Sequence, residues 1–359
     1  MCITGYPVFV ERAAGAIFNS PVQKDLFARY AEEAVTPEHG HLATVQQAAK
    51  EHGVTVVLGI IERPAQRSGT SLYCSIVYIE GTTGDISAIH RKIMPTYEER
   101  LVWSVGDGAG IVTHALNVTG GKPVPAAKAK SPCLPVEPAR ASLHNRYVPH
   151  PSPWVVGMLN CYETWLPLMR AALHGMGENL HFSLWPGSAR NTRDMTRFYA
   201  LEGRSYAVSV SAVLRLSDIL PENVPHHEFV VGAFSTSGVA ADADKLAAAV
   251  GTSPAGDGAG LSDPDILCDG GSCVAAPDGT WLLSPDGTSQ AQEGVFVVEL
   301  EHTQVVRERQ CLDISGHYSR PDVLQLTVNR QRQATVRTVD GPGSFTVGSV
   351  STLNPARPE

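Results

Sequence analysis

Short apolar runs recur along the chain between polar turns, and this pattern predicts a series of buried strands. The clearest runs cover residues 54–61, 72–79 and 85–94, of which the last two are close enough in sequence to form a hairpin. Further strands are expected at 111–116, 155–159, 181–185, 207–215, 273–276, 281–284 and 295–300.

Capping residues followed by proline mark the starts of the first two predicted helices. Ser20-Pro21 is expected to open a helix over about 20–35, and Thr36-Pro37 another over about 36–52. Ser and Thr cap helix starts, and Pro is tolerated in the first turn. Two more helices are expected, one directly after Cys161 and one at about 192–206. Strands that alternate with helices predict an α/β fold.

The composition fits one large α/β domain and argues against several kinds of partner. Of 359 residues, 43% are hydrophobic and 18% are charged, which is enough for a substantial core. A net charge of −8 argues against nucleic acid or an anionic membrane as partner. The sequence shows no long apolar run and no signal-peptide pattern. Seven cysteines without paired spacing suit a reducing cytoplasm.

Cys161 stands at the end of the strand predicted at 155–159, where a helix is expected to begin. A thiol in this position can act as a nucleophile. The amides and partial positive charge of a helix start favour the thiolate, so we expect the pKa of Cys161 to be lowered toward neutrality. Taken alone, a cysteine at a strand end is more often a buried packing residue.

A dense charged segment, residues 90–103, follows the predicted strand that contains residues 85–89. If Lys92 points into a cleft, its ammonium group can stabilise a thiolate and the negative charge of a tetrahedral intermediate. Glu99 is a candidate for orienting Lys92 or for proton transfer. Taken alone, a lysine or a glutamate is usually a solvated surface group.

These two segments together resemble the motifs of the nitrilase family of carbon–nitrogen hydrolases. Residues 90–100 match His-Arg-Lys-x-x-Pro-Thr-x-x-Glu-Arg, and residues 161–163 match Cys-(Trp/Tyr)-Glu. The resemblance favours true nitrilases over amidases and carbamoylases. It covers most of the chain, because further matches lie at 184–188, 191–194, 202–206, 270–279, 307–310 and 316–323.

The resemblance implies a fold, a reaction and a set of site residues. The fold would be a four-layer αββα sandwich, in a homodimer or a larger spiral homo-oligomer. The reaction would be hydrolysis of an organic nitrile to the carboxylic acid and ammonia through a thioimidate, with no cofactor and no metal. Cys161 would be the nucleophile, Lys92 the lysine of a Glu-Lys-Cys triad, and Glu99 an additional active-site glutamate.

Aromatic residues beside the motifs are candidates for the substrate pocket. Tyr97, Tyr162 and Trp185 could line it, although packing roles are equally open. His226 and His227 are adjacent in an extended segment and so point to opposite sides, which makes a shared metal ion unexpected.

The sequence departs from the family pattern in several places. The triad glutamate would fall before Met1, and the strand, helix and strand that open the fold are missing. Either the natural start lies upstream, or the chain is a shortened, inactive member. We expect a single domain over 1–330, with irregular insertions or translated non-coding sequence at 117–154 and 234–265, and a tail at 331–359.

Two alternatives to an active nitrilase stay open at this point. A shortened chain could be a catalytically impaired relative that is kept for oligomer assembly or for binding a small molecule. The same residues could also serve a relative that hydrolyses cyanide or an amide.

Overall fold

The computed structural model describes most of the predicted domain. The described residues are 2–3, 5–7, 9, 18–65, 70–116, 154–187, 189–219, 222, 224–228, 230, 266–286 and 292–333. The expected insertions at 117–154 (except Trp154) and 234–265, and the tail from residue 334 on, lie outside the described residues.

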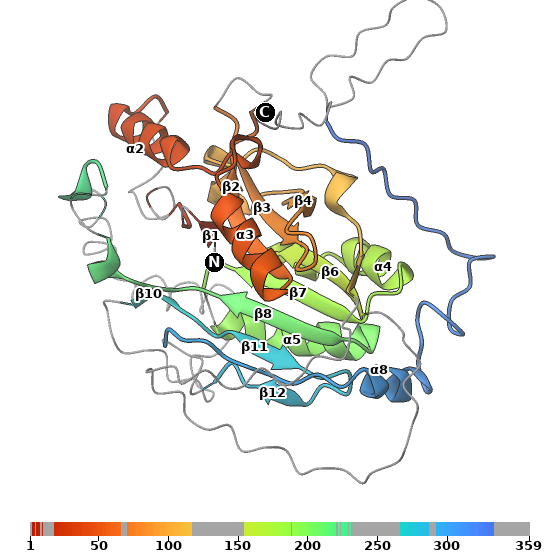
Figure 1. Ribbon diagram of the computed structural model, residues 1–359. Helices are drawn as coiled ribbons and strands as arrows, with labels where there is room; N and C mark the ends of the chain where they lie inside the picture. The colour runs from red at the N-terminus through yellow and green to blue at the C-terminus, as the bar shows by residue number, and fades with distance from the viewer. Residues whose placement is uncertain are drawn as a thin grey trace, which may run out of the picture.

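The first sheet has four strands in the order β1-β2-β3-β4 (Figure 1). The strands are Cys2–Ile3, Val56–Glu62, Tyr73–Ile79 and Ile86–Arg91. β1 runs parallel to β2, and the other neighbours are antiparallel. The pairing of β3 with β4 confirms the predicted hairpin.

The second sheet has six strands in the order β12-β11-β8-β7-β6-β5 (Figure 1). Its three central strands, β6, β7 and β8, are parallel to one another. A separate antiparallel ribbon pairs β9 (Val213–Arg215) with β10 (Ile266–Asp269). In chain order, the six strands of the second sheet are β5 (His114–Leu116), β6 (Trp154–Asn160), β7 (Leu180–Trp185), β8 (Tyr206–Ser211), β11 (Cys273–Ala275) and β12 (Trp281–Leu283).

The two sheets pack face to face through an apolar layer. Ile76 and Tyr78 of β3 lie in one buried cluster with Val156 and Met158 of β6. Successive side chains of a strand point to opposite faces. The intervening Val77 therefore lies on the outer face, in the cluster of α3. Because both faces of β3 are covered, the whole strand is buried and reads as a continuous apolar run.

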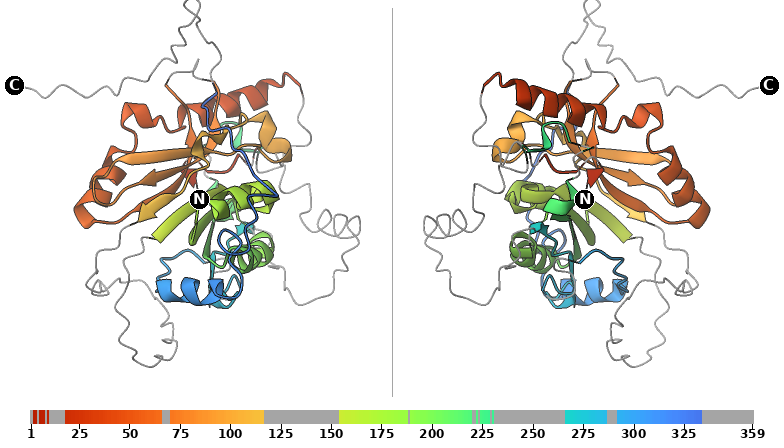
Figure 2. Two further views of the ribbon diagram at one scale, coloured as in Figure 1. Left: turned by 90° about the vertical axis from the view of Figure 1, so that its right-hand side faces the viewer. Right: turned by 90° about the vertical axis from the view of Figure 1, so that its left-hand side faces the viewer.

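Helices cover the outer face of each sheet (Figure 2). α3 (Ala43–His52) packs on the outer face of the first sheet, where Ala49 lies in the cluster of Val77. Leu26 of α2 (Pro21–Glu32) packs in a separate cluster with Ile61 and Cys74. α4 (Pro167–Gly175) and α5 (Ala189–Gly203) pack on the second sheet. The resulting order of layers is helix, sheet, sheet, helix, which confirms the predicted αββα sandwich.

Of the two predicted caps, Ser20 makes a side-chain hydrogen bond at the start of its helix and Thr36 makes none. Ser20 accepts a hydrogen bond from the backbone N–H of Gln23 at 3.4 Å. The second predicted helix is divided into a 3₁₀ turn, Pro37–His39, and α3, because Gly40 takes a left-handed conformation with φ of +77°. α5 begins earlier than predicted, at Ala189, whose N–H donates to Asp269 at 3.0 Å. This cap comes from a distant residue.

Two strand predictions at the carboxyl side need correction. Residues 207–215 form two strands, β8 and β9, because the chain leaves the large sheet at Ala212 and pairs with β10 instead. The strand predicted at 295–300 is wrong: these residues form no strand, and Val297 is 80% exposed. Alternating residues indicate an extended backbone, but a strand also needs a neighbouring edge to pair with.

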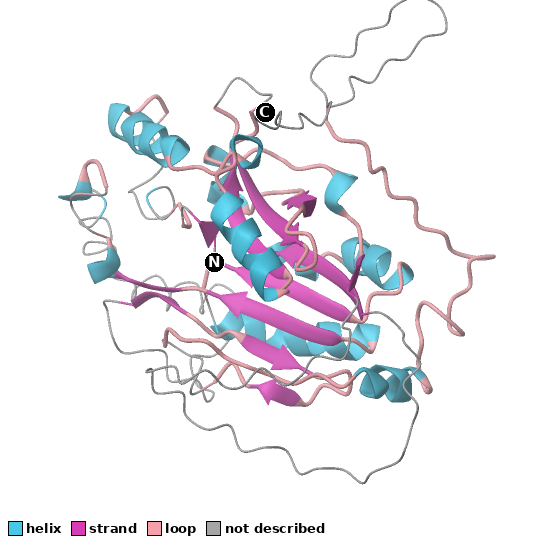
Figure 3. Ribbon diagram, viewed as in Figure 1, coloured by secondary structure: helices cyan, strands magenta, loops and turns pink. Residues whose placement is uncertain are grey.

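The remaining elements are short. α8 (His302–Arg309) was not predicted, and residues 310–333 form a long loop with neither helix nor strand (Figure 3). No described helix is long and apolar enough to cross a membrane. The other 3₁₀ turns are Tyr97–Leu101, Gly108–Gly110, Cys161–Trp165 and Leu216–Asp218.

The layer between the sheets should dominate stability. We expect Ile76→Ala to lower the free energy of unfolding by about 2–5 kcal/mol, because Ile76 is fully buried and its truncation leaves a cavity. Urea unfolding followed by circular dichroism would measure the change. The exposed Val297→Ala is the control and should shift stability by less than about 0.5 kcal/mol. Equal effects of the two changes would contradict this account of the core.

Candidate active site

Lys92 lies directly after β4 and points into the interior. Its backbone N–H donates to the carbonyl of Cys74 at 2.8 Å, which continues the pairing with β3. Its side chain is only 1% exposed, and Nζ donates to Glu99 Oε2 at 2.6 Å. A buried ammonium group needs such a partner, because an unpaired buried charge is strongly unfavourable.

Glu99 is held in place by the short 3₁₀ turn that follows Lys92. The same oxygen, Oε2, also accepts a hydrogen bond from the backbone N–H of Thr96 at 2.6 Å. This carboxylate is buried and faces the lysine, as the sequence predicted for a residue that orients Lys92. The second oxygen of Glu99 accepts no hydrogen bond from the described residues.

Cys161 lies at a tight turn between β6 and the helical layer. Its φ is +53°, in the left-handed region that residues other than glycine rarely adopt. Such strain is found at functional sites that the surrounding structure holds in place. The α-helix does not begin directly after Cys161 as predicted. A 3₁₀ turn, Cys161–Trp165, comes first, and α4 begins at Pro167.

The electrostatics of Cys161 correct the expectation of a lowered pKa. Burial raises the pKa of the thiol to about 11, and the charge of Lys92 only partly opposes this. The negative charge of Glu99 raises it further, while the N–H of Tyr162 lowers it. The backbone N–H of the 3₁₀ turn therefore does not compensate for the loss of solvation of the thiolate. The thiol is therefore protonated at neutral pH, and its activation requires a proton acceptor.

Lys92 responds to the same neighbours in the opposite sense. Burial acts to lower its pKa, but Cys161, once it is ionised, and the negative charge of Glu99 outweigh burial and raise the pKa above its ordinary value. Lys92 is therefore a charged ammonium group throughout the physiological pH range. It can stabilise negative charge on the sulfur or on an atom that the sulfur attacks.

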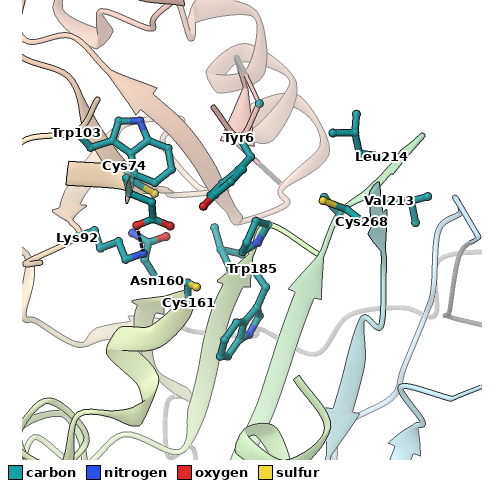
Figure 4. Close-up of a pocket in the computed structure, with 15 residues that line it drawn as sticks. Tyr6, Cys74, Lys92, Trp103, Asn160, Cys161, Trp185, Val213, Leu214 and Cys268 are labelled. Atoms are coloured by element: carbon teal, nitrogen blue, oxygen red, sulfur yellow. Dashed lines mark hydrogen bonds and ion pairs between the residues drawn. The ribbon is translucent and has the colours of Figure 1, made fainter. Parts of the chain in front are cut away.

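These residues open onto a cavity of about 370 Å³ (Figure 4). Val213, Leu214 and Cys268 lie across it from Lys92 in this view. Lys92 and Glu99 are the only charged residues among the described residues that line the cavity. The lining comprises Gly5, Tyr6, Cys74, Lys92, Glu99, Trp103, Asn160, Cys161, Leu184, Trp185, Pro186, Ala212, Val213, Leu214 and Cys268.

The three aromatic residues predicted for the pocket are separated by the structure. Trp185 lines the cavity, with its indole N–H donating to Ser209 at 3.0 Å. Tyr97 is 79% exposed and Tyr162 is 44% exposed, and neither lines the cavity. Tyr162 instead packs edge-on against Trp185, with ring centroids 6.4 Å apart.

Tyr6 and Trp103 provide aromatic walls that the sequence analysis missed. Their rings meet at 84° with centroids 5.7 Å apart, at the junction of the amino-terminal segment and the segment after Glu99. Trp103 belongs to the charged segment 90–103 that also contains Lys92 and Glu99, so this proximity in sequence was an available signal. Tyr6 reaches the cavity only through the fold, because it lies far from the reactive residues along the chain.

The adjacent histidines bind separate groups. His226 Nε2 lies 3.0 Å from Asp25, and His227 Nε2 lies 2.8 Å from the carbonyl of Ile219. Across the described parts of the chain, no three His, Cys, Asp or Glu side chains come together as a metal site would require.

Comparison with known proteins relates the chain to one family. Residues 1–309 match the family model described as carbon-nitrogen hydrolase. An aliphatic nitrilase of Rhodococcus rhodochrous is 27% identical over 94% of this chain and 73% of its own length. An arylacetonitrilase of Macrophomina phaseolina is 28% identical over 93% of this chain and 80% of its own length.

Solved structures to which the chain is similar are more distant in sequence. A carbon-nitrogen hydrolase from Helicobacter pylori aligns with a TM-score of 0.46 and 14% identity, covering 86% of this chain and 78% of that one. A nitrilase-superfamily member from Saccharomyces cerevisiae gives 0.46 and 14%, covering 84% and 80%.

The opposing charges around Cys161 predict opposite effects of two substitutions. Lys92→Met should slow alkylation of Cys161 by iodoacetamide at pH 9, because it removes the charge that lowers the thiol pKa. Glu99→Gln should accelerate alkylation, because it removes a charge that raises the pKa. Each effect should be on the order of tenfold.

Mass spectrometry of the peptide that carries Cys161 would follow this thiol separately from the other cysteines. In the unchanged chain, the alkylation rate should rise with pH up to about 11, the pKa of the buried thiol. A midpoint near 7, or two substitutions that act in the same direction, would contradict the described electrostatics.

Proposed function

Because this chain belongs to the carbon–nitrogen hydrolase family, on its nitrilase branch, and is a hydrolase of carbon–nitrogen bonds, we propose that it hydrolyses an organic nitrile to the carboxylic acid and ammonia. The observation that carries the proposal is the meeting of Cys161, Lys92 and Glu99 at one end of an otherwise uncharged cavity. Cys161 is the proposed nucleophile. Lys92 is proposed to stabilise negative charge, and Glu99 is proposed to transfer protons.

In the first half of the reaction, the sulfur of Cys161 attacks the nitrile carbon. Glu99 takes the thiol proton, and one π bond of the nitrile breaks as the carbon–sulfur bond forms. The nitrogen takes a proton from Lys92 and a thioimidate results. The hydrogen bond of 2.6 Å between Lys92 and Glu99 then returns the proton to the lysine.

In the second half, water replaces nitrogen and then sulfur. A first water adds to the thioimidate carbon, and its protons pass to the nitrogen through Glu99. Ammonia then leaves, and a thioester remains on Cys161. A second water cleaves the thioester, releases the carboxylic acid and restores the thiol. The sum is one nitrile and two waters converted to one acid and one ammonia. Lys92 stabilises the negative charge of each tetrahedral species.

The cavity walls support an uncharged substrate with one polar end. Beyond Lys92 and Glu99 the lining is mostly apolar and includes Trp103, Trp185 and Leu214. A nitrile places its small polar group against the ammonium and its hydrocarbon part against these walls. A carboxylate or ammonium group on the far part of the substrate would lose solvation without gaining a partner there.

Two further features of the protein are proposed with the activity. The seven cysteines of the sequence lie without paired spacing, which supports a reducing compartment such as the cytoplasm. We also propose a homo-oligomer. The long loop at 310–333 supports it, because this loop carries a run of exposed apolar side chains. They are Tyr318, Val323, Leu324 and Leu326.

Ammonia release from a panel of aryl and aliphatic nitriles would test the activity. We expect turnover by the unchanged chain, no turnover by Cys161→Ala, and almost none by Lys92→Ala. Glu99→Gln should lower kcat on the order of a hundred- to ten-thousand-fold, as removal of a proton-transfer group commonly does. Turnover that survives Cys161→Ala would sink the proposal. Amides hydrolysed at least as fast as their nitriles would assign the site to amide hydrolysis instead.

Light scattering after size exclusion would test the oligomer. The unchanged chain should run as a dimer or larger at micromolar concentration. Leu324→Asp should shift it toward the monomer, because it places a charge in the exposed apolar run. Val297→Asp, at another exposed apolar position, is the matched control and should not. A monomeric unchanged chain would refute the proposed assembly.

A further inference from the structure

Glu163 receives hydrogen bonds from both chain segments that carry the reactive side chains. Its Oε1 accepts from the backbone N–H of Ile93 at 2.5 Å, and its Oε2 accepts from the backbone N–H of Asn160 at 2.9 Å. Ile93 directly follows Lys92, and Asn160 directly precedes Cys161. One carboxylate therefore joins the end of β4 to the end of β6.

The carboxylate is buried and stays ionised. Glu163 is 1% exposed, and His90 Nε2 donates to its Oε2 at 2.9 Å. Burial acts to raise the pKa of Glu163, but His90 and the N–H groups of Ile93 and Asn160 outweigh burial and hold it below the ordinary value. Hydrogen bonds to a charged acceptor are stronger than neutral ones, so this connection is stiff.

The segments joined by Glu163 belong to different sheets. β4 is an edge strand of the first sheet, and β6 lies inside the second. The apolar layer between the sheets is non-directional and sets their separation only coarsely. The hydrogen bonds of Glu163 are directional and act one residue away from Lys92 and from Cys161.

We infer that Glu163 is a positioning residue that sets the placement of the Lys92 ammonium relative to the Cys161 sulfur. The inference rests on the proposed function for its catalytic meaning, and the geometry it describes can be tested without turnover. Glu163 itself does not line the cavity, so it acts on the reaction through the two residues that it aligns.

Two substitutions separate the effect of the side-chain length of Glu163 from the effect of its charge. Glu163→Gln keeps the length but replaces one acceptor oxygen by an NH₂ group, which cannot accept from a backbone N–H. Glu163→Asp keeps the charge but is one methylene shorter, so it cannot reach both Ile93 and Asn160. Positioning requires both variants to impair the site.

The readout is the rate of alkylation of Cys161 by iodoacetamide at pH 9 in the full chain, measured on its peptide. We expect both Glu163→Gln and Glu163→Asp to slow alkylation on the order of tenfold, because Lys92 no longer stabilises the thiolate from its native position. A purely electrostatic role predicts the opposite for Glu163→Gln. The charge of Glu163 raises the pKa of Cys161, so its removal alone would accelerate alkylation.

Glu178→Gln is the matched control for loss of a buried carboxylate. Glu178 is fully buried and binds the side chains of His181 at 2.7 Å and Tyr199 at 2.5 Å, but neither catalytic segment. It should lower the thermal midpoint and leave alkylation of the folded protein unchanged. Circular dichroism at the assay temperature would establish the folded fraction of each variant.

Kinetics add a second readout if the chain turns over a nitrile. Glu163→Gln should lower kcat about a hundredfold with a much smaller change in KM, because misplacement of reactive groups affects the transition state more than binding. Faster or unchanged alkylation in either Glu163 variant, or equal slowing in the Glu178 control, would overturn the inference. Absence of nitrile turnover with the expected alkylation pattern would instead refute the proposed function and leave the positioning role intact.

Discussion

Three consecutive basic side chains at the end of β4 are buried, and each is paired with a carboxylate from a different element. Burial of a charged or hydrogen-bonding group without a partner is unfavourable, so β4 can take its place only when all three carboxylates are in theirs. The packing of the site is therefore cooperative, and the elements around β4 are fixed together. The pairs are His90 with Glu163, Arg91 with Glu62, and Lys92 with Glu99.

The apolar layer and these polar pairs act at different scales. Ile76 and Tyr78 pack against Val156 and Met158, which brings the ends of β4 and β6 to the same side of the sandwich. Sheets packed in this way lie roughly 10 Å apart. This distance leaves room for a cavity wherever side chains do not fill the space between the sheets. The polar pairs then select one arrangement of the reactive groups inside that space. The apolar layer contributes most of the stability, and the polar pairs set the geometry that the chemistry requires.

The sequence was most informative where local chemistry decides the structure. The cap at Ser20 and the hairpin of β3 and β4 follow from neighbouring residues, and both are present. The motif around Lys92 and Glu99 predicted that the two would meet, which they do at 2.6 Å.

Features that depend on tertiary contacts were beyond the sequence. The pKa of Cys161 rises because the thiol is buried, and burial is a property of the whole fold. Tyr6 reaches the cavity from the amino-terminal segment, and α5 is capped by the distant Asp269. Residues 295–300 carry the right alternation for a strand, but they form none. In each case the deciding partner lies far away along the chain.

The division of the core between two sheets has a consequence for biosynthesis. When the first sheet and its two helices have left the ribosome, the inner face of this sheet is still uncovered. Ile76 and Tyr78 belong to this face. The cover, β6, emerges only after residues 117–153 have been made. Exposed apolar faces and unpaired strand edges make nascent chains prone to aggregate. The interval between synthesis of β3 and synthesis of β6 is thus the one in which this apolar face is most exposed to aggregation.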